Sequence, residues 1–187
     1  MKYLVLLEGN TEKAFIELLM DKGMFKIDAD DMLDLRPHQK RQIDPALHAL
    51  IRQLPPEEKV KIIKIGDKLS DKLKIPKDIK DKIDSEEKYC TKPEFEMLII
   101  ISEGLYNEYQ KVKSKKKPKV FAKESIKYNG KRYTNSQEWI KGYFIDEYKI
   151  KYALDEYKRI SQHKKQERYL TDLIRKSLTR QGYKNGC

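Results

Sequence analysis

Short apolar runs alternate with amphipathic segments over the first third of the chain. The runs KYLVLL and VKIIKI are nearly continuous in apolar residues and have strand length, as expected for strands buried on both faces of a parallel sheet. Between them, apolar residues recur at helical spacing. The first 71 residues therefore predict a βαβαβ unit. Its predicted elements are strands over 2–7, 32–35 and 60–65 and helices over 11–22 and 45–54.

The pattern loosens after residue 71. Residues 72–88 alternate in charge, which predicts a short helix or a lid. A helix starting at Pro93 is apolar all round in its middle, so we expect it to be buried from several sides. The dipeptide Asn129-Gly130 signals a type I′ hairpin within residues 126–133. The remaining predicted helices cover 136–145, 150–162 and 166–178.

These elements predict an α/β fold with a mostly parallel sheet flanked by helices. Residues 1–109 are expected to form the core, and residues 110–187 a basic extension of hairpin and helices packed on it. No apolar run approaches the ~20 residues of a membrane span. The chain opens directly on a strand, so we expect a cytoplasmic protein without a membrane partner. Two cysteines, and three histidines without ligand spacing, exclude a structural zinc site.

Positive charge is concentrated in the second half of the chain. The net charge is +11, but residues 1–109 carry −3 and residues 110–133 alone carry +9. This asymmetry suits a protein whose acidic half holds a metal and whose basic half holds a polyanion. Solvated helix faces in a lysine-rich chain explain the charge equally well.

Two carboxylates stand where predicted strands end. Glu8 follows the first strand, and Asp67 follows the strand over 60–65, with Asp71 four residues later. Ligands of open parallel sheets bind beyond the carboxyl ends of the strands. A hard cation such as Mg²⁺ prefers oxygen ligands of this kind. The alternatives are structural: Glu8 caps the following helix, and Asp67 is a turn residue.

The segment LVLLEGNTE, residues 4–12, resembles the opening of Toprim domains. The resemblance is greatest to the EG-x-TE form of the OLD-nuclease and RloB-like branches, and it implies a Rossmann-like fold with Glu8 as the first catalytic acid. Toprim domains carry a paired Asp-x-Asp after a later strand. Here Asp67 matches the first aspartate, but Leu69 stands at the second, so that either Asp71 replaces it or the ligand is lost.

A proline, aromatic and glutamate cluster of the same branches resembles KPEFEM, residues 92–97. Glu96 matches its glutamate, and Glu94, two residues away, cannot face the same site if both lie on one helix. The resemblance spans about residues 3–105 and implies a metal-dependent nuclease, with a role in genome defence. Its catalytic residues would be Glu8, Asp67 and Glu96, and its Mg²⁺ or Mn²⁺ ligands Glu8, Asp67, Asp71 and Glu96.

The expected partner is DNA or RNA. Several tyrosines interleave with the basic residues and either stack on unpaired bases or belong to the core; they are Tyr128, Tyr133, Tyr143 and Tyr148. Two alternatives to a nuclease remain: a non-catalytic nucleic-acid-binding protein, and a subunit that works with an ATPase partner. The residues expected to bind the nucleic-acid backbone are Lys115, Lys116, Lys117, Lys131, Arg132, Lys164, Lys165 and Arg168.

Overall fold

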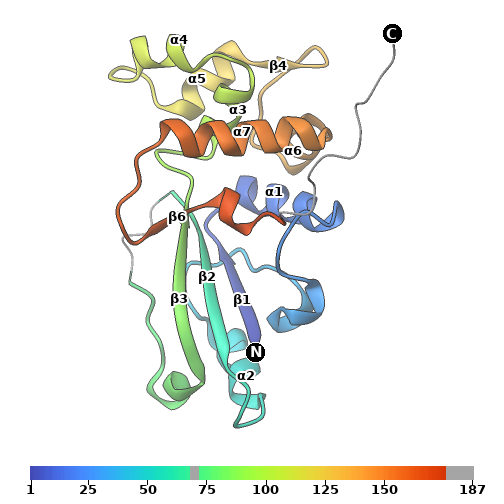
Figure 1. Cartoon of the computed structure of the whole chain (residues 1–187), viewed down its shortest axis with the longest axis vertical. Coiled ribbons are helices and arrows are strands. Elements are labelled where there is room, and N and C mark those ends of the chain that lie inside the picture. The colour runs from blue at the N-terminus through green and yellow to red at the C-terminus, as the bar shows by residue number, and fades with distance from the viewer. Residues whose placement is uncertain (68–71, 176–187) are drawn as a thin grey trace.

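Four parallel strands form the central sheet of the computed structural model, which describes residues 1–67 and 72–175. Each strand pairs in parallel with its neighbour in the order β1-β2-β3-β6. Helices flank the sheet, so the predicted α/β class with a parallel sheet is confirmed (Figure 1). The strands are β1 (Lys2–Leu7), β2 (Val60–Gly66), β3 (Ile83–Cys90) and β6 (Glu167–Tyr169).

The two faces of the sheet bury different sets of apolar residues, because side chains alternate along each strand. Val5 and Ile63 face the larger cluster, which includes residues of α1, α3, α6 and α7. Leu4 and Ile62 face a smaller cluster that includes residues of α2. The nearly continuous apolar sequence of β1 and β2 follows from this burial on both sides.

Most helices gather around the carboxyl ends of the strands (Figure 1). There α6 packs on α1, and α7 packs on α3; α4, α5 and a two-stranded hairpin lie beyond them, whereas α2 lies near the other end of the sheet. The helices are α1 (Asn10–Asp21), α2 (Pro45–Gln53), α3 (Glu96–Ser102), α4 (Tyr106–Val112), α5 (Pro118–Ser125), α6 (Gln137–Tyr143) and α7 (Glu147–Ile160). The hairpin is β4 (Lys127–Tyr128) and β5 (Lys131–Arg132), and short 3₁₀ helices are η1 (Ala29–Asp31), η2 (Leu33–Leu35), η3 (Lys77–Lys82) and η4 (Leu170–Leu173).

Three phenylalanines join the helices to one another. Phe15 of α1 contacts Phe95 edge-to-face at a ring-centroid distance of 5.2 Å and Phe144 at 5.1 Å. All three side chains are buried. Edge-to-face aromatic pairs add to the stabilisation from area burial, so these contacts hold α1, the segment before α3 and the end of α6 together.

The strand predicted over 32–35 is wrong. Residues 33–35 form η2, and the chain touches β1 through the single bridges Tyr3–Met32 and Leu6–His38. Asp34 and Leu35 have φ angles of 59° and 58°, which a strand does not accommodate. The predicted βαβαβ unit therefore lacks its middle strand, and β1 pairs directly with β2.

Two strands made of charged residues were not predicted. Within the segment 72–88, predicted as a short helix or lid, residues 77–82 form the short helix η3, but residues 83–88 belong to β3. Residues 167–173, inside the helix predicted over 166–178, form β6 and η4. Neither β3 nor β6 has the alternating apolar residues that mark a strand in the sequence. Both are joined to the sheet by ion pairs: Glu87 of β3 binds Lys61 of β2 and Arg168 of β6, each at 2.8 Å.

The predicted hairpin is confirmed. Asn129 and Gly130 connect β4 to β5 with φ angles of 49° and 75°, the positive values that a type I′ turn requires. The predicted division at residue 109 stays a prediction; β6, which follows it, completes the sheet. Among the described helices, none combines the length and apolar character needed to cross a membrane.

Replacing Phe144 by alanine is expected to destabilise the protein by about 3–5 kcal/mol, because a fully buried ring in contact with Phe15 leaves a cavity. Urea denaturation followed by circular dichroism measures this change. The adjacent Ile145 is 65% exposed, and Ile145→Ala should change the stability by less than about 0.5 kcal/mol. Equal losses in the two variants would contradict the described packing.

Candidate carboxylate site

Four carboxylates meet at the carboxyl ends of β1 and β2. Glu8 follows β1, Asp67 follows β2, Glu12 lies in the first turn of α1, and Glu96 is the first residue of α3. The negative charges of Asp67, Glu96 and Glu8 all act on Glu12. The parallel pairing of β1 with β2 therefore brings together acids that are far apart in the sequence.

Glu8 lies directly over Gly66. Its Oε2 atom is 2.4 Å from the position that a Cβ atom on Gly66 would occupy, so any larger residue at 66 would displace the carboxylate. Its Oε1 atom is bound by Arg41 at 2.9 Å. Arg41 remains largely exposed, with 60% of its side chain accessible. Gly9 is the N-cap residue of α1, and the predicted alternative that Glu8 caps this helix stays a prediction.

Glu12 is a buried acid, with 8% of its surface exposed. Its pKa is raised to about 7, mainly by burial and to a smaller extent by the charges of Asp67, Glu96 and Glu8, against the lowering effect of a backbone N–H. A carboxyl group with this pKa is about half protonated at neutral pH. The protein itself therefore places several acidic side chains close together around Glu12.

Glu96 is also buried, and its partner comes from the hairpin. The hydroxyl of Tyr133 donates a hydrogen bond of 2.7 Å to Glu96 Oε1. Burial and the nearby Glu96 charge raise the pKa of Tyr133, so its hydroxyl remains a donor. Glu94, in contrast, precedes α3, and its Oε2 atom accepts the backbone N–H of Lys119 at 2.9 Å.

The donor atoms suit a hard divalent cation, since they are carboxylate oxygens and a cation would offset the repulsion acting on Glu12. As the side chains stand, no three His, Cys, Asp or Glu residues within 1–67 and 72–175 are close enough together to hold a metal ion. Arg41 and Tyr133 already bind Glu8 and Glu96. The oxygen atoms of the cluster are therefore of the type that binds a hard cation. In this structure two of the carboxylates are bound by protein groups instead.

Of the predicted ligands, Glu8, Asp67 and Glu96 lie in this cluster. Asp71 and Leu69, on which the comparison with the Asp-x-Asp motif depends, lie outside the described residues. The sequence reasoning missed Glu12 as a site residue and Tyr133 as the partner of Glu96. Glu12 had a signal in the EG-x-TE motif, four residues after Glu8, whereas Tyr133 is 37 residues from Glu96 and had none.

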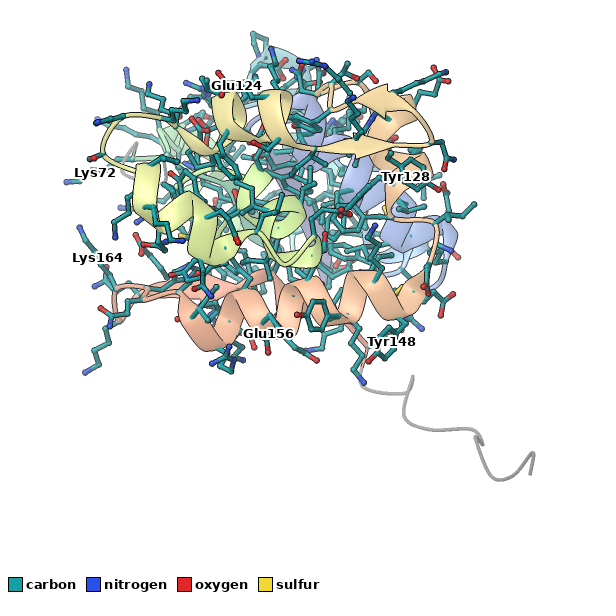
Figure 2. All side chains as sticks on the ribbon, turned by 90° about the horizontal axis from the view of Figure 1, so that it is seen from above. Lys72, Glu124, Tyr128, Tyr148, Glu156 and Lys164 are labelled. Carbon is teal, nitrogen blue, oxygen red and sulfur yellow. The ribbon has the colours of Figure 1, made fainter. Side chains whose placement is uncertain are left out.

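The residues predicted to bind nucleic acid come from separate segments of the chain. Lys115, Lys116 and Lys117 connect α4 to α5, and Lys131 and Arg132 form β5. Lys164 and Lys165 are exposed in the connection from α7 to β6, beside the label of Lys164 in Figure 2. Arg168 is bound to Glu87 at 2.8 Å.

The tyrosines are divided between core and surface. Tyr133 and Tyr143 are buried and contact Trp139, which identifies them as core residues. Tyr128 is half-buried against the same ring. Tyr148 is 77% exposed on α7 and is available to a ligand.

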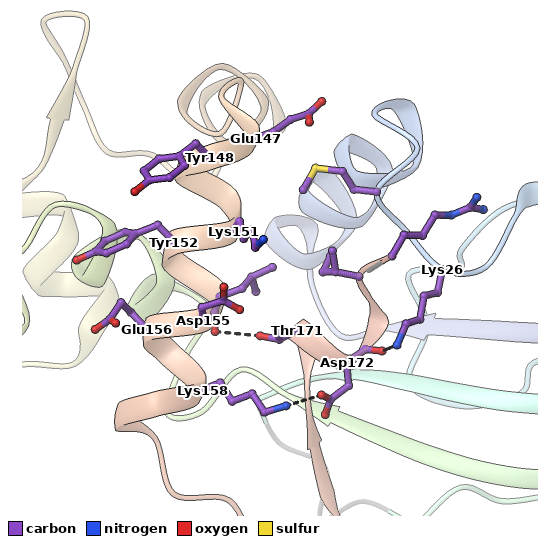
Figure 3. Close-up of a pocket in the computed structure, with 14 residues that line it drawn as sticks. Lys26, Glu147, Tyr148, Lys151, Tyr152, Asp155, Glu156, Lys158, Thr171 and Asp172 are labelled. Carbon is purple, nitrogen blue, oxygen red and sulfur yellow. Dashed lines mark hydrogen bonds and ion pairs between the residues drawn. The ribbon is translucent and has the colours of Figure 1, made fainter. Parts of the chain in front are cut away.

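A cavity of about 830 Å³ lies apart from the carboxylates, between α7, η4 and the segment after α1 (Figure 3). Its lining balances Lys26, Lys151, Lys158 and Arg175 against Glu147, Asp155, Glu156 and Asp172. Some of these charges pair within the cavity, as Lys158 does with Asp172 at 2.6 Å. The cavity therefore lacks the grouping of acids that marks the carboxylate cluster.

Glu12→Gln is expected to stabilise the protein at pH 8. The folded pKa of about 7 lies above the usual 4.5, so the folded state loses stability as the pH rises from about 5 to 8, when the buried acid ionises. The variant should be on the order of 1–3 kcal/mol more stable at pH 8 and nearly equal at pH 5. Denaturant titrations at both pH values measure this, and a gain that does not depend on pH would contradict the assignment.

No protein-family model matches the chain, and no curated protein or solved structure matches it. The similarity to Toprim domains thus rests on the sequence motifs, and the expected ATPase partner rests on that similarity alone. The site itself is defined by its geometry and charge.

Proposed function

We propose that the protein is a metal-dependent nuclease that hydrolyses phosphodiester bonds at the carboxylate cluster. The observation that carries the proposal is the meeting of Glu8, Glu12, Asp67 and Glu96, with the pKa of Glu12 raised to about 7. Natural proteins tolerate such repulsion chiefly where a function requires it. The resemblance to Toprim domains and the site's position at the ends of parallel strands support the same proposal.

The four carboxylates would hold Mg²⁺ or Mn²⁺. When bound, a cation of this type polarises the phosphate and lowers the pKa of water. The protein's own contribution is to set the acids on rigid elements: Glu8 against Gly66, and Glu96 at the start of α3 with the Tyr133 hydroxyl on one oxygen.

Arg41 and Glu12 have further roles in this proposal. Arg41 is exposed at the edge of the site, and its guanidinium has the planar fork that matches phosphate oxygens. On substrate binding, the Arg41 side chain would leave Glu8 and bind the substrate phosphate. The Glu8 carboxylate would then be able to bind the cation. Glu12 holds a proton about half the time at neutral pH and releases it when positive charge arrives.

A second candidate function is nucleic-acid binding without catalysis. It is favoured by the two protein donors already on the acids, Arg41 on Glu8 and Tyr133 on Glu96. In that case the cluster is a polar network that fixes the hairpin to α3 and the segment of Arg41 to the end of β1. The two candidates differ in whether a divalent cation binds.

Calorimetric titration of Mg²⁺ or Mn²⁺ into the protein at pH 7 is expected to release about half a proton per cation, because Glu12 is half protonated there. Repeating the titration in buffers of different ionisation enthalpy gives the proton count. Cleavage of plasmid, single-stranded DNA and RNA should need the cation and stop with EDTA.

Glu12→Gln should abolish both the proton release and the cleavage. Its control is Glu17→Gln on the same helix, because Glu17 binds Lys141 at 3.1 Å and takes no part in the cluster. This control should behave like the wild type. Absence of cation binding in the wild type would reject the nuclease and favour binding without catalysis.

A further inference from the structure

The segment over residues 111–132 forms a basic cap on the molecule. It comprises the end of α4, the connection 113–117, α5 and the hairpin, onto which Figure 2 looks from above. Glu124 is its single acid. The cations of the cap are Lys111, Lys113, Lys115, Lys116, Lys117, Lys119, Lys123, Lys127, Lys131 and Arg132.

The charges of this cap are mostly unneutralised. Lys116 pairs with Glu124, and among the described residues no other cap side chain forms an ion pair. The cavity beside α7 differs in this respect, since its four cations face four acids. An accumulation of unpaired lysines is unfavourable in isolation, and a polyanion relieves it by releasing its own counterions.

The cap is packed on the core, and the residue that follows it is bound to the carboxylate site. Phe121 and Ile126 are buried in the main core, and Tyr109 contacts Phe121 edge-to-face. Glu94 binds the N–H of Lys119, and Tyr133, directly after the cap, binds Glu96. The end of the basic surface therefore lies beside Glu96, the first residue of α3.

We propose that the cap binds the phosphate backbone of a nucleic acid, without reading its bases. The inference rests on the proposed function and extends it, because the end of the cap adjoins the carboxylate site through Tyr133, which binds Glu96. Lysines that no protein group holds in a fixed orientation suit contacts with the phosphates of a nucleic acid, which are the same for every base sequence. An anionic membrane fits less well, because Val120 is the one large apolar side chain exposed among the cap residues, and membrane-surface helices present an apolar face.

Two triple variants with equal charge test the proposal. Lys115, Lys117 and Lys131 are exposed in the cap, and replacing each by Gln removes three charges. The control replaces Lys74, Lys77 and Lys80 by Gln; these lysines are exposed before and within η3, which leads into the start of β3 at the other end of the sheet. None of the six forms an ion pair within the described part of the chain. Thermal melts check that both variants fold.

Fluorescence anisotropy with labelled 30-nucleotide DNA and RNA, single- and double-stranded, measures binding in EDTA between 50 and 200 mM NaCl. The cap variant is expected to bind about 10–100-fold more weakly near 100 mM salt, and its log–log salt slope should fall by about 2–3. The control should stay within about threefold of the wild type. Equal losses in both variants, or cap-dependent binding to phosphatidylserine vesicles but not to nucleic acid, would overturn the inference.

The outcome is separable from that of the proposed nuclease. Binding is measured without a cation and is repeated with Glu12→Gln, so cap-dependent binding without any cleavage would reject the nuclease and leave the cap assignment standing. Conversely, cleavage by the cap variant with an unchanged KM would reject the cap and leave the nuclease standing.

Discussion

The approach of Glu8 to Gly66 is the contact on which the rest of the site depends. The N–H of Glu8 extends the pairing of β1 with β2 by binding the carbonyl of Ile65 at 3.0 Å, so the backbone fixes where the side chain begins. Because Gly66 has no side chain, the carboxylate occupies the space above the neighbouring strand. The acid is thereby carried by the sheet itself rather than by a loop, and Glu12 and Glu96 are arranged around it by the helices that pack at the same edge.

The acids of the site and the lysines of the cap lie in different environments. Acids are buried at the ends of the strands, where Glu12 and Glu96 are less than a tenth exposed, whereas the lysines of the cap stand outward. Burying an acid beside other acids costs stability, since both desolvation and repulsion disfavour the ionised form. The aromatic contacts between α1, α3 and α6 offset this cost, with Phe15, Phe95 and Phe144 fully or almost fully buried.

Elements that are stabilised by burying apolar residues, or by a local turn preference, could be predicted from the sequence. Elements that depend on ion pairs or hydrogen bonds between distant residues could not. The strands β1 and β2 were predictable because both of their faces are apolar, and the hairpin because Asn129 and Gly130 favour positive φ. Strand β3 was missed because Glu86 and Glu87 form ion pairs with residues of adjacent strands, which a single sequence does not reveal. In the site, Glu8 and Asp67 were accessible as residues that end strands. Tyr133 was not, since its role arises only when the hairpin folds back onto α3.

The position of β6 has a consequence for how the chain folds. This strand pairs with residues 88–90 but comes from residues 167–169, so the sheet is completed only after almost 80 further residues have followed β3 out of the ribosome. Until then β3 is an open edge that offers its backbone to other chains. Its run of glutamates and a lysine protects that edge during synthesis, because charged side chains disfavour edge-to-edge aggregation. The charged residues that made β3 hard to predict from the sequence thus also disfavour aggregation of the nascent protein.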